Sequence, residues 1–204
     1  MVSKGVKGSS TAKPKTARSE KRRELLLETT LRLVAEGGVD SVTHRRVAEA
    51  AAVPLGSTTY YFTSRRHLLR EAFAHYLEQT TRLQKELAPR LEGAVADDIV
   101  ELLVEFTERE FADADMLRAE YELTLFASRD AEVAELLHRW DEWMVASLAR
   151  SLEALGASRS FDGARTLLDL LRGYELDRLT RKELDSAGLR RRLTAVVDAF
   201  LPRD

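Results

Sequence analysis

Apolar residues recur at helical spacing along most of this chain. From Ser19 onward, leucine, threonine and valine side chains return every three or four positions until Gly37 and Gly38 interrupt the pattern. Such spacing places the apolar side chains on one face of a helix. The pattern therefore predicts a first helix of about 18 residues.

The next two predicted helices are short, and the fourth is long. Thr43 is a good N-cap for a helix through Ala51, and residues 55–62 leave room for only one more short helix. Ser64 is placed to cap a long fourth helix that ends near Pro89.

The second half of the chain continues as helices. Its apolar pattern is interrupted near Ala114, Arg129, Gly156 and Ser186, which predicts five further helices after Gly93. No run of alternating apolar and polar residues indicates a strand, and no long internal repeat occurs. We therefore expect an all-α fold of about nine helices.

The last two predicted helices are apolar over more than one face. Such a helix is either central in a large core or packed on two sides, and in a chain of 204 residues we expect a partner subunit to cover it. This interpretation is a homodimer through residues 163–180 and 187–201, with Leu193 and Val197 in the interface.

Charge is distributed unevenly between the two ends of the chain. Residues 1–70 hold 14 Lys and Arg against 6 Asp and Glu, a net charge of +8, whereas the remainder holds 18 against 28, a net charge of −10. Residues 1–17 lack periodic apolar positions and are rich in Lys, Ser, Gly and Thr, which is typical of a flexible basic arm. A basic end on an acidic chain is the charge pattern expected for contact with nucleic acid.

Composition excludes several other classes of protein. The chain has no cysteine, so it holds neither disulfides nor thiolate metal sites, and we expect no metal and no cofactor. Its basic start lacks the apolar stretch of a secretory signal, and no apolar run approaches the roughly 18 residues that span a bilayer. These features indicate a cytoplasmic protein without a membrane partner.

Residues 42–69, VTHRRVAEAAAVPLGSTTYYFTSRRHLL, contain the most specific motif. Ala48 is small enough to let two helices cross closely, and Val53 can fill the joint between them. Gly56 leaves space for a phosphate to approach the backbone, and Phe62 is placed to anchor the short helix in the core. The hydroxyl groups and aromatic rings that follow Gly56 suit hydrogen bonding to DNA.

Cations stand at the first turns of two predicted helices. His44, Arg45 and Arg46 begin the second helix, and Arg65 and Arg66 begin the fourth. The helix dipole disfavours a positive charge there by roughly 0.3–1 kcal/mol each. DNA phosphates approaching both N-termini would reverse that sign, although Arg46 and Arg66 also fit solvated charges and His44 a spectator.

The string PLGSTTYYF and its surroundings resemble the DNA-binding signature of the tetracycline-repressor (TetR) family of transcriptional regulators. The likeness is close over residues 20–70 and extends beyond that only to helix number and length. It implies a three-helix helix-turn-helix domain, residues 18–64, followed by a helical bundle for ligand binding and dimerisation, residues 65–204. It also implies a homodimer that binds double-stranded operator DNA and responds to a small-molecule effector, with repression the more usual outcome.

In the TetR family the third helix lies in the major groove, and the resemblance carries over residue by residue. Arg45 would then reach a base, Arg65 would meet a phosphate, and Tyr61 would contact DNA unless it is a core aromatic. Thr59 stands where the family commonly has tyrosine, so the base preference does not transfer. The predicted DNA-binding residues are Lys13, Lys15, Arg18, Thr43, His44, Arg45, Gly56, Ser57, Thr58, Thr59, Tyr60, Tyr61 and Arg65.

The acidic second domain carries large apolar side chains with a few polar tips, which suits an effector pocket but also fits a plain core. Arg172 and Glu175 stand three residues apart on a leucine-rich helix, either as a polar pair in the pocket or as a salt bridge on the helix surface. The predicted ligand-binding residues are Phe106, Tyr121, Phe126, Trp140, Trp143, Met144 and Arg172.

Two other classes of function were weighed against a regulator. His67, His75 and His138 lie in separate helical segments, and the sequence has no HExxH, GxSxG, GxGxxG or P-loop motif, so we predict that the chain is not an enzyme. The alternative that remains is a ligand-independent DNA-binding or protein-interaction module. Such a module would bind its operator regardless of any metabolite.

Overall fold

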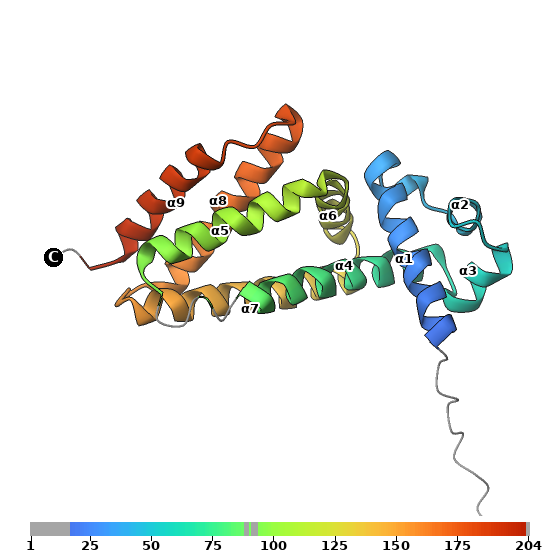
Figure 1. Ribbon diagram of the computed structural model, residues 1–204. Coiled ribbons are helices and arrows are strands. Elements are labelled where there is room, and N and C mark those ends of the chain that lie inside the picture. The colour runs from blue at the N-terminus through green and yellow to red at the C-terminus, as the bar shows by residue number, and fades with distance from the viewer. Residues whose placement is uncertain (1–16, 88–89, 91–93, 203–204) are drawn as a thin grey trace, which may run out of the picture.

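The structure, a computed structural model, describes residues 17–87, 90 and 94–202 of the chain (Figure 1). Within these residues it has nine α-helices, one short 3-10 helix and no strand, which confirms the predicted all-α fold. Lys13 and Lys15 of the predicted basic arm lie outside the described residues.

The first three helices form a unit at one end of the molecule, which we call the head (Figure 1). Thr43 accepts a hydrogen bond from the backbone N–H of Arg46 at 3.1 Å, as an N-cap does, so this predicted helix start is confirmed. The elements of the head are α1 (Ala17–Gly37), η1 (Val39–Ser41), α2 (His44–Ala50) and α3 (Leu55–Tyr61).

One long helix, α4 (Arg65–Leu87), leads from the head and lies against α7, while α5 to α9 form what we call the body (Figure 1). The hydroxyl of Ser64 accepts from the backbone N–H of His67 at 3.1 Å, which confirms its predicted cap. The body helices are α5 (Ala96–Ala112), α6 (Ala114–Ala127), α7 (Ala131–Ala154), α8 (Ser160–Arg181) and α9 (Ser186–Phe200), and their breaks fall where the sequence predicts them.

Two apolar cores hold these helices together. The first joins α1, α2 and α4 to α6 and the start of α7, and Phe62 is buried in it as predicted. The second joins α5, α7, α8 and α9. Because the head shares its core with α6 and α7, a shift of those helices reaches the head through packed side chains.

The apolar side chains of α9 pack inside the chain rather than against a partner subunit, where the sequence suggests they would lie. Leu193 and Val197 are buried within the single chain, in the second core with α5 and α8, so their predicted place in a dimer interface is wrong. Two sides of α9 are covered by the protein's own helices. On the neighbouring helix α8, by contrast, two large apolar side chains stay exposed, Phe161 at 61% and Leu176 at 51%.

The turn between α2 and α3 contains a residue in an unfavourable backbone region. Ala52 has a φ of 51°, in the left-handed region, while Val53 N–H donates to Ala48 O at 2.9 Å and Ala52 N–H to Glu49 O at 3.1 Å. These two bonds form a Schellman motif, in which glycine usually takes the left-handed position. An alanine side chain there costs free energy that glycine avoids.

We therefore expect Ala52→Gly to stabilise the protein by about 0.5–1 kcal/mol, the strain that is relieved minus the added entropy of the unfolded glycine. Ala50→Gly is the matched control, since Ala50 is exposed inside α2, where glycine costs about as much as it gains at residue 52. Urea unfolding followed by circular dichroism measures both variants. The strain interpretation is wrong if Ala52→Gly is no more stable than the parent chain.

Candidate nucleic-acid interface and internal cavity

The outward face of α3 is polar and open. Tyr60 is 80% exposed, and Gly56 has no atom within 4 Å of the position that a Cβ would take. Thr59 is also exposed, and Ser57 is half-buried. These side chains can reach a partner without any change in the head.

Thr58 faces the other way and corrects one expectation. Its side chain is fully buried, and its hydroxyl donates to Leu55 O at 2.8 Å, with His44 O at 3.4 Å. A residue that fills the joint between α2 and α3 cannot touch DNA from there. Its contribution to binding is to position α3 against α2.

Tyr61 is half-buried and connects α3 to α1. Its hydroxyl lies 2.9 Å from the Ser19 hydroxyl and donates to Ser19 O at 3.1 Å. The edge of its ring meets the exposed ring of Tyr60, with centroids 5.0 Å apart. This geometry favours the core interpretation of Tyr61, in which it supports Tyr60.

The second helix carries one largely exposed arginine and one that is hydrogen-bonded to the backbone. Arg45 has 82% of its side chain exposed and meets Glu49 only through an exposed contact of 3.2 Å. Arg46 donates to Ser41 O at 2.9 Å. His44 is half-buried, and its Nδ1 is buried without a hydrogen-bond partner in the described part of the protein. Arg45 is therefore the side chain of α2 best placed to reach outward.

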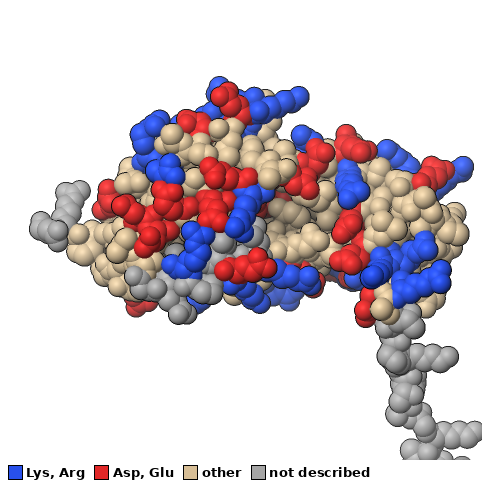
Figure 2. Space-filling view, viewed as in Figure 1, with Lys and Arg blue, Asp and Glu red and all other residues tan. Residues whose placement is uncertain are grey.

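Arg65 is hydrogen-bonded to the head, although 39% of its side chain stays exposed. Its Nε donates to Val42 O at 2.9 Å, and its Nη2 donates to Val39 O at 2.5 Å and to Asp40 at 3.1 Å. These bonds tie the start of α4 to η1, so a phosphate would have to compete with them. The predicted phosphate contact of Arg65 stays a prediction, as does that of exposed Arg18. Figure 2 shows Lys and Arg side chains gathered low on the head, where α1 begins.

An internal cavity of about 20 Å³ lies in the body where the two apolar cores meet. Its volume suits roughly one water molecule. Four of the predicted ligand-binding residues line it, namely Phe106, Trp140, Met144 and Arg172. The remaining lining residues are Glu110, Glu120, Leu168, Leu171 and Glu175.

Three of these lining residues are glutamates, and burial raises the pKa of each carboxyl. The pKa of Glu110 is raised well above its usual value, that of Glu120 is raised, and that of Glu175 is raised from 4.5 to about 8. Desolvation is the main cause in all three, because it disfavours the charged form. Tyr76 donates to Glu120, and the Tyr121 hydroxyl lies 2.9 Å from Glu175 Oε2.

Arg172 and Glu175 both line the cavity, as the pocket interpretation has it, but Arg172 forms its ion pair with another residue. Its Nη2 donates to Asp141 Oδ1 at 2.5 Å, so it pairs across helices rather than with Glu175. Arg165 binds the other oxygen of Asp141. The guanidinium of Arg172 also lies 6.0 Å from the ring centroid of Trp140. The one cation at the cavity is therefore already neutralised by a carboxylate.

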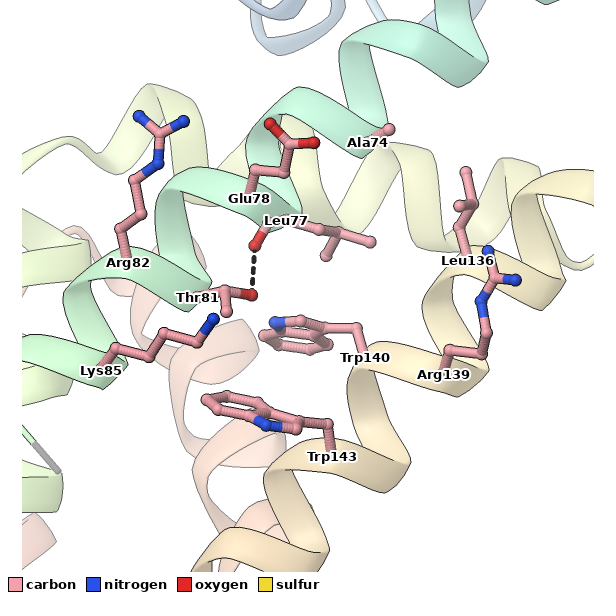
Figure 3. Close-up of a pocket in the computed structure, with 10 residues that line it drawn as sticks. All are labelled: Ala74, Leu77, Glu78, Thr81, Arg82, Lys85, Leu136, Arg139, Trp140 and Trp143. Carbon is pink, nitrogen blue, oxygen red and sulfur yellow. Dashed lines mark hydrogen bonds between the residues drawn. The ribbon is translucent and has the colours of Figure 1, made fainter.

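A groove of about 640 Å³ runs between α4 and α7 on the other side of Trp140 (Figure 3). Both indole rings, Trp140 and Trp143, point from α7 toward Thr81 and Lys85 of α4. Trp140 lines the groove and the cavity, so its ring separates them. Its Nε1 is buried and has no hydrogen-bond partner among the described residues.

The structure sorts the predicted ligand-binding residues further. Trp143 lines the groove only, and Tyr121 contacts Glu175 next to the cavity. Phe126 packs on the first core and lines neither space. Sequence reasoning missed Glu110 and Glu120, which could have been suspected only as charged residues that interrupt largely apolar helices.

Ion pairs join the start of α4 to the start of α7. Arg66 binds Asp130 through Nε at 2.5 Å and Nη2 at 3.1 Å, so it is more than a solvated charge. Asp130 also caps α7 by accepting from two backbone N–H groups, and hydrogen bonding to Arg66 lowers its pKa. Arg70 binds Glu132 one turn further along. These pairs fix the N-terminus of α7 to the helix that carries the head.

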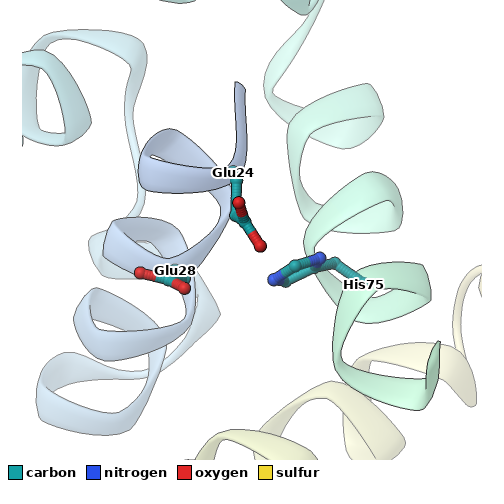
Figure 4. Close-up of side chains that lie close together, drawn as sticks. All are labelled: Glu24, Glu28 and His75. Carbon is teal, nitrogen blue, oxygen red and sulfur yellow. The ribbon is translucent and has the colours of Figure 1, made fainter. Parts of the chain in front are cut away.

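A set of three possible metal ligands was also missed. Glu24 and Glu28 of α1 face His75 of α4, with their ligand atoms within 4.8 Å of one another (Figure 4). Arg23 and Arg82 line the adjacent surface hollow with Glu24 and His75, and their positive charges disfavour a cation there. The expected absence of a metal stays a prediction.

Comparison with known families gives two matches. Residues 26–72 match a family described as bacterial regulatory proteins, tetR family, and residues 94–203 match a tetracyclin repressor-like C-terminal domain. The second match covers more than half of the chain. None of the helices in the described part of the chain combines the length and apolarity that crossing a bilayer requires.

Individual relatives are transcriptional regulators. The regulator PksA of Bacillus subtilis is 25% identical over 125 residues, which is 61% of this chain and 60%, less than two thirds, of PksA. A solved regulator of Streptomyces coelicolor A3(2) is 31% identical, with a TM-score of 0.65 over 87% of this chain and 98% of its own. The multidrug binding protein EbrR complexed with ethidium is 28% identical, with a TM-score of 0.64 over 86% of this chain and 98% of EbrR.

The raised pKa of Glu175 predicts how stability depends on pH. The folded protein binds a proton that the unfolded chain releases between pH 4.5 and about 8, so stability falls as the pH rises through that window. Glu175→Gln should flatten this fall, by up to about 1 kcal/mol per pH unit. Thermal unfolding between about pH 5 and 8.5 measures this dependence of stability on pH. The carboxyls of Asp130 and Asp141 do not interfere, because their pKa values are lowered and they titrate below this range.

Glu153→Gln is the control for this series, because Glu153 is exposed on α7 and lines neither the cavity nor the groove. It should follow the parent chain at every pH. If Glu175→Gln also follows the parent chain, Glu175 is ionised in the folded protein at neutral pH and its burial is compensated in another way.

Proposed function

Because this chain belongs to the TetR family of bacterial transcriptional regulators, we propose that it is a repressor that binds a palindromic operator as a homodimer and releases it when a small-molecule effector binds. The observation that carries the proposal is the combination of an open helix-turn-helix face with a groove that is walled by α4, the helix leading to it. We place this activity in the cytoplasm, where operator DNA is found.

On the DNA side, Arg45 and Tyr60 are the side chains that we assign to base reading. Both are largely exposed, and they come from the two helices that flank the turn. An arginine in the major groove can bind guanine through two hydrogen bonds. We assign phosphate contacts to Lys13, Lys15 and Arg18 of the basic N-terminal segment, on the strength of their charge.

On the effector side, the cavity and the groove form one site once Trp140 moves. The cavity alone is about 20 Å³, too small for a metabolite, whereas the groove beyond the indole ring adds about 640 Å³. The related EbrR is complexed with ethidium and, in other structures, with proflavin and imidazole, which supports a small-molecule site in this fold. We assign effector binding to the domain of residues 65–204, and operator binding to residues 18–64.

Helix α4 can carry the signal from this site to the DNA. It forms one wall of the groove, and its first turns are bound to α7 through Arg66 and Arg70. A ligand that displaces Trp140 of α7 therefore shifts α4, and the head at the N-terminal end of α4 moves with it. An effector that prefers the displaced state 100-fold supplies about 2.7 kcal/mol, enough to empty a modestly occupied operator.

The operator assignment predicts that Arg45→Ala weakens binding to the selected operator by roughly 1–3 kcal/mol per half-site and leaves binding to a scrambled duplex nearly unchanged. The reason is that a lost base contact removes specificity, whereas a lost phosphate contact weakens all sequences. Fluorescence anisotropy on both duplexes measures the effect, with Arg150→Ala of the body as the control. Equal losses on the two duplexes would place Arg45 among the phosphate contacts.

The dimer assignment now rests on α8, whose exposed apolar side chains need a cover. Charging Phe161 and Leu176 together, as Phe161→Glu with Leu176→Glu, should give monomers because an apolar interface cannot bury unpaired carboxylates. Leu125→Glu is the control, since Leu125 is 69% exposed on α6 and lies on neither α8 nor α9. Sedimentation velocity reports the state of each variant. A double variant that stays dimeric moves the interface away from α8.

A further inference from the structure

The cavity holds more negative charge than its surroundings can neutralise. Glu120 is 8% and Glu175 is 5% exposed, and both line the cavity together with Glu110. No ion pair among the described residues includes any of the three. Arg172 is the nearest compensating cation, and its guanidinium is bound to Asp141.

Protons take the place of a cation in this arrangement. Glu110 and Glu175 line the same cavity, and repulsion from Glu175 adds to desolvation in raising the pKa of Glu110, so these carboxyls keep their protons at a pH where exposed ones lose them. Tyr76 and Tyr121 donate to Glu120 and Glu175 and so stabilise what charge is left. Carboxyls buried in this way cost free energy that a purely structural core would avoid.

Trp140, which lies beside the acids, has a polar group without a hydrogen-bond partner. The Nε1 of Trp140 is buried without a partner, although an indole N–H in the interior normally has one. The face of an indole ring attracts positive charge. Trp143 lies next to Trp140 along the groove, and Trp140 also lines the cavity that holds the carboxyls.

We propose that the effector of this chain is an organic cation, whose positive group lies among Glu110, Glu120 and Glu175 and whose apolar part lies against Trp140 and Trp143 in the groove. The inference rests on the proposed function, because it names the class of ligand for the same site. The cation displaces protons that the glutamates hold, and the ring of Trp140 turns aside to admit it.

An anionic or a neutral ligand fits the site less well. An anion would meet three carboxyls in the cavity, where the lining cation Arg172 is bound to Asp141, whereas Arg82, Lys85 and Arg139 line only the groove. A neutral ligand would leave the buried acids protonated and would gain no electrostatic attraction from them. A cation alone converts the cost of burying these groups into attraction in a medium of low dielectric constant.

The charges around the site also set a pH dependence for cation binding. Binding favours ionised Glu175, whose pKa of about 8 means that the proton must leave first at lower pH. Affinity for a permanent cation should therefore rise as the pH increases from about 6 to 9. The titratable and charged groups that act on Glu175 are Glu110, Glu120, Tyr121 and Arg172, while Tyr76 and Asp141 bind Glu120 and Arg172 beside it.

The test measures the binding of three aryl probes that differ in charge to the full chain. Tetraphenylphosphonium is a permanent cation that does not intercalate into DNA, tetraphenylborate is an anion of nearly the same size, and triphenylphosphine oxide is neutral. Intrinsic fluorescence reports binding directly, because the chain has 2 tryptophans and both line the groove. The variants are Glu175→Gln and its combination with Glu120→Gln, with exposed Glu153→Gln as the control and thermal melting as the check on folding.

We expect the cation to bind, the double variant to lose at least about tenfold in cation affinity, and Glu175→Gln to remove the rise with pH. Glu153→Gln should bind the cation as the parent chain does. Tetraphenylborate or the neutral probe binding more tightly than the cation overturns the inference. So does the absence of cation binding up to millimolar concentration, or cation affinity that is unchanged in the folded double variant.

Operator anisotropy in the presence of the same probes separates this inference from the proposed function. If a neutral or anionic probe releases the operator, effector sensing stands and the cationic class is wrong. If the cation binds through the glutamates but the operator stays bound, the class of ligand stands and the effector role of the site is wrong.

Discussion

The presence of three glutamate carboxyls at a cavity between two apolar cores is the constraint on which the proposed effector response depends. Glu110, Glu120 and Glu175 come from three different helices, α5, α6 and α8, and converge on a cavity of about 20 Å³. Elsewhere the interior is filled by leucine, valine and aromatic side chains. The acids can stay there only in protonated form or beside a cation, so the state of the cavity changes with whatever occupies it.

The same place is mechanically connected to the DNA-binding face. Trp140 lies between the cavity and the groove, and α7, which carries it, is bound at its N-terminus to Arg66 of α4 through Asp130. Asp130 has two roles, since it caps α7 and binds the helix that leads to the head. Its carboxylate therefore couples the start of α7 to the orientation of α4. The head follows because its apolar core includes α4, α6 and the start of α7.

The sequence predicts the helices and the helix-turn-helix because those depend on local pattern and on caps, such as Thr43 and Ser64, that act within one turn. It also predicts the burial of Phe62 and four cavity-lining residues. Which hydroxyl of α3 points inward could not be predicted, since Thr58 is buried only because α2 crosses at that point.

Long-range pairing sets the remaining limits of prediction. Leu193 and Val197 look like interface residues until α5 is known to cover them, and Glu110 and Glu120 look like surface charges until three helices bring them together. Arg65 and Arg66 stand at a helix N-terminus, where their charge is unfavourable by itself. Their partners, Asp40 and Asp130, are distant in sequence, so only the fold shows that the cations are paired.

The distance between the two heads of the proposed dimer is the most direct measure of whether occupation of the acidic cavity controls the DNA-binding face. The chain has no cysteine, so Ala50→Cys on the exposed side of α2 allows a single spin label on each subunit, and pulsed electron paramagnetic resonance then gives one distance distribution. We expect tetraphenylphosphonium to shift that distribution in the parent chain and to leave it unchanged when Glu120 and Glu175 are both replaced by glutamine. A parent chain that binds the cation with no change in the distance between its heads would contradict the proposed coupling.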